Sequence, residues 1–191
     1  MKNLKNNYLS VEKNISAVPS VQDVNAELQA KKLQLHWLLQ ITKAINYNFS
    51  TKQLFDVYEH VLRSQLKVEK LALLIHDQHW RCSLLYGTDK NFEDIDLTKI
   101  IGELNKLHNL EMEQELWIST FETILPVYHK DQLIAYALVG GLGNSVIPKR
   151  NELIPFIHTI TNLIVVAIEN NTKKKKKIRQ AGIRKELELA A

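Results

Sequence analysis

Two pairs of short apolar segments constrain the fold of this chain most strongly. Residues 70–86 hold two apolar runs on either side of polar residues 77–79, and the second run stops at Gly87. Residues 123–142 repeat this arrangement around polar residues 129–132. Apolar runs of this length that are joined by tight polar turns predict β-hairpins. Helical patterns lie on both sides of the hairpins, so we expect an α+β fold in which helices flank a central antiparallel sheet.

Long helices are predicted near both ends of the chain. From Val21 to Ile45, apolar side chains recur in steps of three and four residues, a heptad pattern typical of helices that pair. This face either pairs with a second subunit or packs on its own domain. A second long helix has apolar positions from Leu153 to Ile168, and Pro148 fits its first turn. The residues that we assign to a homodimer contact are Val24, Leu28, Leu35, Leu38, Ile45, Ile164 and Ile168.

A shorter helix is expected after the first one. Residues 46–50 break the helical pattern, and Ser50 or Thr51 can cap the helix that follows. Residues 97–107 also fit a helix, whereas residues 109–121 favour no single structure.

Charge is distributed unevenly along the chain. The 191 residues include 25 Lys or Arg and 21 Asp or Glu, a formal net charge of +4. Residues 173–191 hold eight of the basic and two of the acidic residues, so residues 1–172 have a net charge of −2. A nucleic-acid-binding domain needs its positive charge on a folded face, so we expect no specific nucleic-acid partner. The five lysines at 173–177 point all around a helix, and their simplest role is that of a solvated linker.

Aromatic and sulfur-containing side chains gather in the predicted hairpins. A ligand pocket needs apolar walls with a few polar groups, but the core of a domain needs the same residues. A pocket, if the domain has one, is expected between the sheet and residues 92–121. The candidate pocket residues are Trp80, Cys82, Tyr86, Trp117, Tyr128 and Tyr136.

Motifs for catalysis and for metal binding are weak. His76 and His79 form an H-x-x-H pattern on a hairpin tip, but no further ligand lies nearby in sequence, so we predict no metal site. The sequence contains no G-x-S-x-G, P-loop or C-x-x-C motif. The glycine-rich residues 140–143 lack the Lys-Ser/Thr of a P-loop and are interpreted as the end of a strand. We therefore expect no catalytic residues and no cofactor in this chain.

The sequence also bounds the cellular location. The only cysteine, Cys82, excludes an internal disulfide. The N-terminus lacks the apolar core of a signal peptide. The apolar runs at residues 71–75 and 163–168 are shorter than the ~20 residues that span a bilayer. We expect a cytoplasmic protein without a membrane span.

The order of the predicted elements, together with residues 125–141 (LPVYHKDQLIAYALVGG), resembles a GAF domain. In that family a strand with an apolar-Pro-apolar step turns through a polar hairpin into an apolar strand, and Pro126 supplies the proline here. The resemblance covers roughly residues 35–170. It implies a sensor module that either binds a small molecule of unknown identity or serves as a ligand-free dimerisation scaffold, and both alternatives stay open.

Two ligand-binding subsets of the GAF family do not match. Phe92 is followed by Asp96, as in the cyclic-nucleotide-binding subset, but Leu97 replaces the Glu of that signature and no Asn-Lys pair lies upstream. The bilin-binding subset has a cysteine beside a histidine, whereas Cys82 lies between Arg81 and Ser83.

The last nine residues, 183–191, resemble the helix ahead of the catalytic domain in bacterial serine phosphatases of the stage-II-E sporulation type, which regulate sigma factors. This resemblance implies that the chain is the N-terminal regulatory region of such a phosphatase, with the catalytic domain fused after Ala191. The implied substrate is a phosphorylated regulator protein.

Together these observations predict four regions. Residues 1–20 form a flexible leader, and residues 21–48 form a helix for signalling and dimerisation. Residues 49–171 form the GAF-like sensor domain, and residues 172–191 form a basic helical linker. The predicted function is a non-catalytic, homodimeric sensor in signal transduction that controls the fused serine/threonine phosphatase. The alternatives are a dimerisation scaffold without a ligand and, more weakly supported, a nucleic-acid-binding protein with a basic tail.

Overall fold

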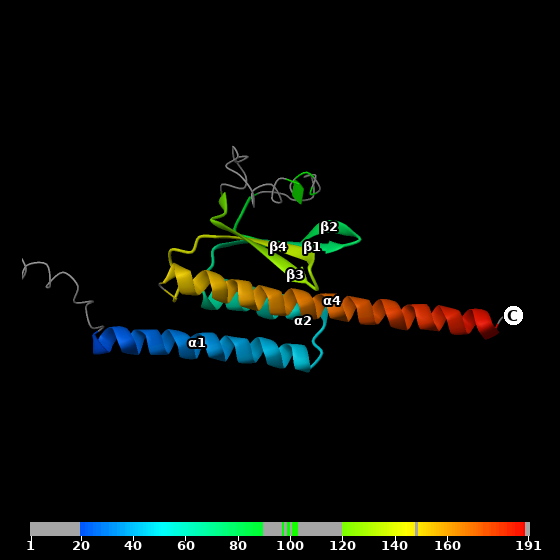
Figure 1. The fold of residues 1–191 in the computed structure, drawn as a ribbon, viewed down its shortest axis with the longest axis horizontal. Helices are drawn as coiled ribbons and strands as arrows, with labels where there is room; N and C mark the ends of the chain where they lie inside the picture. The colour runs from blue at the N-terminus through cyan, green and yellow to red at the C-terminus, as the bar shows by residue number, and fades with distance from the viewer. Residues whose placement is uncertain are drawn as a thin grey trace, which may run out of the picture. The chain divides into compact units, whose positions relative to one another are not determined.

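The computed structural model describes residues 20–89, 97, 99, 101–102, 120–147 and 149–189, with side chains described as far as residue 184 (Figure 1). The chain divides into two compact units, Met1–Leu35 and His36–Ala191. Apart from Ser20, the predicted leader at residues 1–20 lies outside the described residues.

The described part of the first unit is helical. Helix α1 covers Val21–Asn46, and its last eleven residues belong to the second unit. The Ser20 hydroxyl accepts a hydrogen bond from the Asp23 N–H (3.1 Å), and the Asp23 carboxylate accepts one from the Ser20 N–H (3.1 Å). This reciprocal pair is equivalent to a capping box and fixes the start of α1.

The second unit is built on a four-stranded sheet with the order β2-β1-β4-β3. All neighbouring strands are antiparallel, and both predicted hairpins are confirmed. Because β1 and β3 run in the same direction, the turns of the two hairpins lie at the same end of the sheet. The strands are β1 (Lys70–Asp77), β2 (His79–Tyr86), β3 (Thr123–His129) and β4 (Gln132–Gly140).

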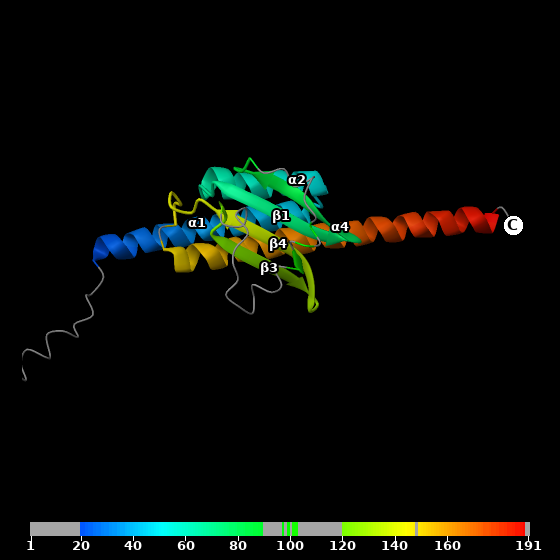
Figure 2. The ribbon, with the colours of Figure 1, turned by 90° about the horizontal axis from the view of Figure 1, so that it is seen from above.

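Helices cover one face of this sheet. These are α2 (Thr51–Glu59), the π-helix η2 (His60–Gln65) and α4 (Arg150–Leu189). Figure 1 shows α2 and α4 on the same side of the sheet, and Figure 2 shows the sheet lying over both helices. Together with the C-terminal part of α1 they enclose the main core, in which Ile41 of α1, Leu73 of β1 and Ile160 of α4 are fully buried. The α+β class is confirmed.

A buried hydrogen bond links α2 to α4 across this core. The hydroxyl oxygens of Tyr58 and Thr161 lie 2.7 Å apart, and the Thr161 hydroxyl donates to the carbonyl oxygen of Ile157 (2.7 Å). Thr161 has a single hydroxyl proton, so the Tyr58 hydroxyl is the donor in the first bond. Both polar groups are thereby satisfied inside an apolar core.

The structure shows where the two predicted helices after α1 begin. Ser50 accepts a hydrogen bond from the Gln53 N–H (3.3 Å), and the Gln53 side chain accepts one from the Ser50 N–H (2.9 Å), so Ser50 is the cap. Helix α4 begins at Arg150, and Pro148 lies outside the described residues. Its 40 residues continue without a break through the five lysines at 173–177.

The glycine-rich residues 140–143 end a strand, as predicted. Strand β4 stops at Gly140, and Gly141 has a φ of +67°, a conformation that glycine adopts without strain. The N–H groups of Gly141 and Leu142 donate to the Glu122 carboxylate (2.7 and 3.1 Å). This internal carboxylate occupies the donors that a phosphate would need. Arg150 also donates to Glu122 (2.6 Å), which attaches the start of α4 to the same loop.

Candidate functional site

The face of the sheet opposite the helices carries three of the predicted pocket residues. Trp80, Cys82 and Tyr136 lie there in one apolar cluster, into which Phe121 and Ile101 also pack. The rings of Trp80 and Tyr136 are 5.9 Å apart between centroids. This second face is therefore aromatic and apolar, as expected for a ligand-binding surface or for a core.

Tyr86 does not belong to this face, which corrects the prediction for that residue. Leu73 pairs with Leu84 and Leu74 pairs with Cys82, so Ser83 is an extra residue that forms a β-bulge. A bulge of one residue reverses the alternation of side chains beyond it. Tyr86 consequently packs in the core on the helix face.

Two further candidates are also separated from the cluster. Tyr128 lies on the edge strand β3 and is 53% exposed. Trp117 lies outside the described residues, so its place in a pocket stays a prediction.

Burial on the second face raises the pKa values of its titratable side chains. Burial raises the pKa of the Cys82 thiol to about 11. Burial also raises the pKa of Tyr136. The nucleophilic form of cysteine is the thiolate, and at neutral pH Cys82 is a protonated thiol.

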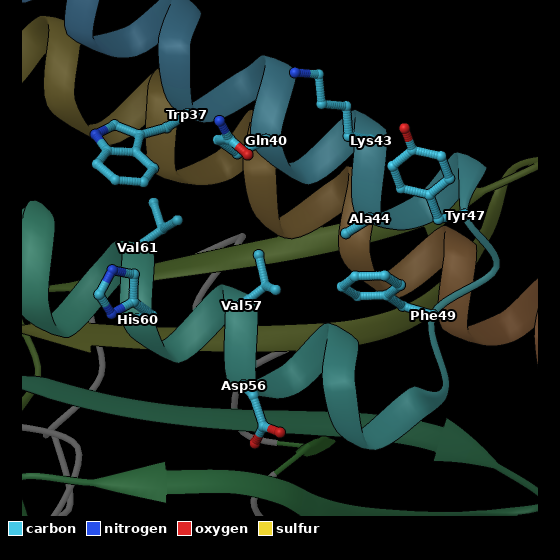
Figure 3. A pocket seen from close by; sticks show the side chains of 10 residues that line it. All are labelled: Trp37, Gln40, Lys43, Ala44, Tyr47, Phe49, Asp56, Val57, His60 and Val61. Atoms are coloured by element: carbon cyan, nitrogen blue, oxygen red, sulfur yellow. The ribbon is translucent and has the colours of Figure 1, made fainter.

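A groove on the helix side of the sheet was not predicted. It has a volume of about 420 Å³ and lies between the C-terminal part of α1 and the helices α2 and η2 (Figure 3). Trp37, Ala44 and Tyr47 line it from α1, and Val57 and Val61 line it from the other side. Phe49, in the loop between the helices, closes one end of the groove in Figure 3. No sequence pattern indicated this groove because its walls come from two separate helices.

A third feature ties both hairpin tips to α4. The Lys176 ammonium group donates to the Asp77 carboxylate at the β1–β2 turn (2.6 Å). Glu169 pairs with Lys173 (2.5 Å) and with His129 at the β3–β4 turn. A cavity of about 220 Å³ lies between the β1–β2 turn and α4. Lys176 therefore binds a hairpin tip, and Lys173 pairs with Glu169 one turn earlier in the same helix, which corrects the interpretation of the whole run as a solvated linker.

These ion pairs shift the pKa values of both carboxyl groups. The hydrogen bond from Lys176 lowers the pKa of Asp77, with a smaller opposing effect of burial. Burial alone would raise the pKa of Glu169, but the hydrogen bonds from Lys173 and His129 outweigh it and lower the pKa. Both groups are therefore held as carboxylates at the point where α4 leaves the sheet.

The H-x-x-H pattern lies across the first hairpin. His76 pairs with Trp80 in the register, and their rings are 5.1 Å apart, while His79 pairs with Asp77. Within residues 20–89, 120–147 and the other described positions, no three His, Cys, Asp or Glu side chains are grouped in a way that could hold a metal ion.

The seven residues assigned to a dimer contact fall into three classes. Val24, Leu28 and Leu35 are 49–58% exposed. Leu38 and Ile45 are partly buried against the core of the domain. The prediction is wrong for Ile164 and Ile168, because both side chains are buried in the core of the same chain.

Comparisons with known proteins define the fold class. Neither a protein-family model nor a curated protein matches the sequence. Among solved structures, the chain is similar to a GAF domain from Pseudomonas syringae pv. tomato, whose parent protein is assigned as a sensor histidine kinase. The similarity has a TM-score of 0.50 at 11% sequence identity and covers 82% of this chain and 99% of the other. The GAF-like fold is thereby confirmed; at this identity the likeness concerns the fold alone.

The region Arg150–Arg184 of α4 is long and apolar enough to cross a membrane by length and composition. Half of its most apolar window is buried inside the protein. Leu153, Ile157 and Ile160 of this region lie in the main core. This packing accounts for the apolar composition of α4 without a lipid environment.

Proposed function

We propose that this chain is a homodimeric sensory and regulatory domain that controls a C-terminal serine/threonine phosphatase domain in signal transduction. The observation that carries the proposal is the course of α4. This helix begins in the core of a GAF-like domain and continues into an exposed basic segment. A change in the packing of the domain is thus transmitted to whatever follows the helix.

The fold supports a sensory role. The solved structure with the similar fold is a GAF domain of a protein assigned as a sensor histidine kinase. The apolar second face, with Trp80, Cys82 and Tyr136, supplies a surface on which a small molecule can bind. In this proposal the sheet packs against α4 in two alternative ways. A ligand that binds one of these two states more tightly increases its population.

The exposed face of α1 supports a homodimer. Leu35 is 58% exposed, and Leu39, one turn later, is also exposed. Ile41 lies two residues beyond Leu39, about 200° further round the helix, and is buried in the domain core. The apolar residues Val24, Leu28, Leu35 and Leu39 therefore form a seam on the side of α1 away from its buried face, suited to pairing with the same seam of a second copy.

The phosphatase assignment rests on the resemblance of residues 183–191 to the helix ahead of the catalytic domain in the stage-II-E sporulation-type serine phosphatases. The proposed substrate is a phosphoserine- or phosphothreonine-containing regulator protein. The ion pairs Lys176–Asp77 and Glu169–His129 hold the start of this segment against both hairpin tips. Release or tightening of these contacts is the proposed step between the sensor and the phosphatase.

The test is to read the gene beyond the codon for Ala191 and to assay the longer protein for metal-dependent release of phosphate from a phosphoserine protein. Insertion of one residue after Gln180 rotates the following helix by about 100°, whereas insertion of seven residues nearly preserves its phase. We expect the one-residue insertion to change the basal phosphatase rate. The seven-residue insertion is expected to leave this rate unchanged. A reading frame without a catalytic domain would refute the phosphatase assignment, and equal rates in all proteins would refute transmission through α4.

The dimer is tested separately by sedimentation equilibrium of the 191-residue chain. Leu28→Glu places a charge in the apolar seam and is expected to yield monomers. Ala26→Glu introduces the same charge at an exposed position about 160° away on the same helix and is the matched control. A monomeric parent chain, or equal association of both variants, would contradict the seam.

A further inference from the structure

The groove between α1 and α2 has the dimensions of a small-molecule site. Its volume of about 420 Å³ falls in the range of about 300–1,000 Å³ that is typical of ligand pockets. Figure 3 shows side chains from α1 and from α2 facing each other across the groove. Trp37 and Phe49 lie near its two ends, with Ala44 and Val57 between them. These flat walls suit a planar, apolar body.

The polar groups at the rim favour an anionic substituent. Gln40 and Lys43 line the groove from α1. The Lys43 ammonium group has no hydrogen-bond or ion-pair partner among the residues that the structure describes. Asp56 lines the opposite rim, and in Figure 3 its carboxylate points away from the aromatic side chains. The Lys43 side chain also extends away from the groove in Figure 3, so this flexible chain has to turn inward to bring its ammonium group to a ligand.

A change of helix type occurs at the same place. Helix α2 becomes the π-helix η2 at His60, which lines the groove together with Val61. The Leu66 N–H donates to the Val61 carbonyl oxygen (2.9 Å), a spacing of five residues. Single π-helical turns inside helices are rare and often mark functional sites.

We propose that this groove binds a planar, largely apolar small molecule that carries one anionic group. The ring system lies between Trp37 and Phe49, and Lys43 binds the anion. This site is on the opposite side of the sheet from Trp80, Cys82 and Tyr136. The binding step requires neither the proposed phosphatase nor the dimer.

One hydrogen bond connects the groove to α4. The Asn171 side-chain amide donates to the carbonyl oxygen of Phe49 (3.2 Å). Asn171 lies two residues before the lysine run, between Glu169 and Lys173. A ligand that displaces Phe49 therefore acts on α4 at the point where its ion pairs hold the hairpin tips.

The experiment titrates the 191-residue chain with 2-naphthoate and with its neutral counterpart 2-naphthamide. Isothermal titration calorimetry gives both affinities, and amide NMR spectra locate the site. We expect both compounds to bind and naphthoate to bind about two- to fivefold more tightly, the gain that one exposed ion pair provides. The largest shifts are expected at Ala44, Phe49 and Val57.

Three variants and one control assign the interaction to the groove. Lys43→Gln is expected to remove the preference for naphthoate without changing the affinity for naphthamide. Lys52→Gln is the matched control, because Lys52 is an exposed lysine of α2 that does not line the groove. Val57→Trp fills the groove and is expected to abolish binding of both compounds. Tyr47 is 73% exposed, so Tyr47→Ala is expected to weaken the binding of both compounds without a large effect on folding.

The outcomes are decisive in each direction. Shifts around Phe49 with a preference for naphthoate that only Lys43→Gln removes would support the site. Absence of binding at millimolar concentration, or shifts confined to the second face around Leu74 and Tyr136, would overturn it. Equal loss of the preference in Lys43→Gln and Lys52→Gln would also overturn it, since the attraction would then be non-specific.

Discussion

The two faces of the sheet are built from the same strands but differ in how they are covered. On the helix face, long side chains of α4 such as Ile160 and Ile164 are fully buried against the sheet. On the second face, Leu74 and Leu138 are also fully buried, but Trp80, Cys82 and Ile124 are only partly buried. Burial of apolar surface is the main stabilising term in folding. The helix face is therefore expected to contribute more to stability than the partly buried positions of the second face.

The largest expected effect compares one substitution on the two faces. Ile160→Ala removes a fully buried side chain from the helix face and is expected to lower the free energy of unfolding by about 2–5 kcal/mol. Ile124→Ala, on the second face, removes a partly buried side chain and should cost clearly less. Chemical denaturation of both variants gives the two values. Equal losses would show that the two faces contribute alike to stability.

Cys82 reports on the second face by its reactivity. Burial raises the pKa of its thiol from 9.0 to about 11. The thiolate is the reactive form, so at pH 8 we expect alkylation about a hundredfold slower than that of a thiol with the ordinary pKa. The rate is measured by mass spectrometry with iodoacetamide. Trp80→Ala should accelerate it by exposing the thiol, whereas Ile160→Val on the other face should not; an unchanged rate in Trp80→Ala would contradict this burial.

The helix face contains a directional polar contact that tests its packing. Tyr58 donates to Thr161, and Thr161 donates to Ile157. Tyr58→Phe leaves Thr161 with its bond to the Ile157 carbonyl, so we expect a loss of only about 1 kcal/mol. Thr161→Val leaves the Tyr58 hydroxyl buried without an acceptor and should cost about 1–3 kcal/mol. Thermal unfolding of both variants shows which substitution costs more stability. A larger loss in Tyr58→Phe would contradict the assignment of Tyr58 as the donor.

The sequence predicted the arrangement of strands and helices better than it predicted the site. Both hairpins follow from local patterns, because each pairs two neighbouring apolar runs across a short turn. Tyr86 was misplaced because the β-bulge at Ser83 depends on the register between β1 and β2, which alternation alone does not reveal. Sequence periodicity also could not distinguish the buried face of α4, with Ile164 and Ile168, from a dimer seam, since both use the same spacing.

Contacts between distant residues were beyond sequence reasoning for another reason. Asp77 and Lys176 are 99 positions apart, and five consecutive lysines look alike in sequence. The groove likewise needs α1 and α2 to pack at a particular distance, which brings Trp37 and His60 to 6.1 Å between ring centroids. Such juxtapositions arise from tertiary packing and leave no periodic pattern.

The smallest expected effect concerns the end of the helix face, where α4 leaves the sheet. Lys176→Gln removes the ion pair with Asp77, whereas Lys175→Gln removes a neighbouring exposed charge for which the described residues include no partner. Exposed ion pairs contribute about 0.2–1 kcal/mol. We expect amide hydrogen exchange in residues 173–180 to accelerate about two- to fivefold in Lys176→Gln and to change little in Lys175→Gln.

The pH dependence gives this last comparison a defined sign. The pKa of Asp77 is lowered from 3.8 by the hydrogen bond from Lys176, so the native state favours the carboxylate. The stabilisation is complete above the ordinary value and is lost as the pH falls through the lowered pKa. The difference in thermal stability between Lys176→Gln and the parent protein should therefore be constant near pH 7 and shrink below pH 3.8. A difference that persists in strong acid would mean that Lys176 stabilises α4 without Asp77, and the hairpin tip would then not hold this helix.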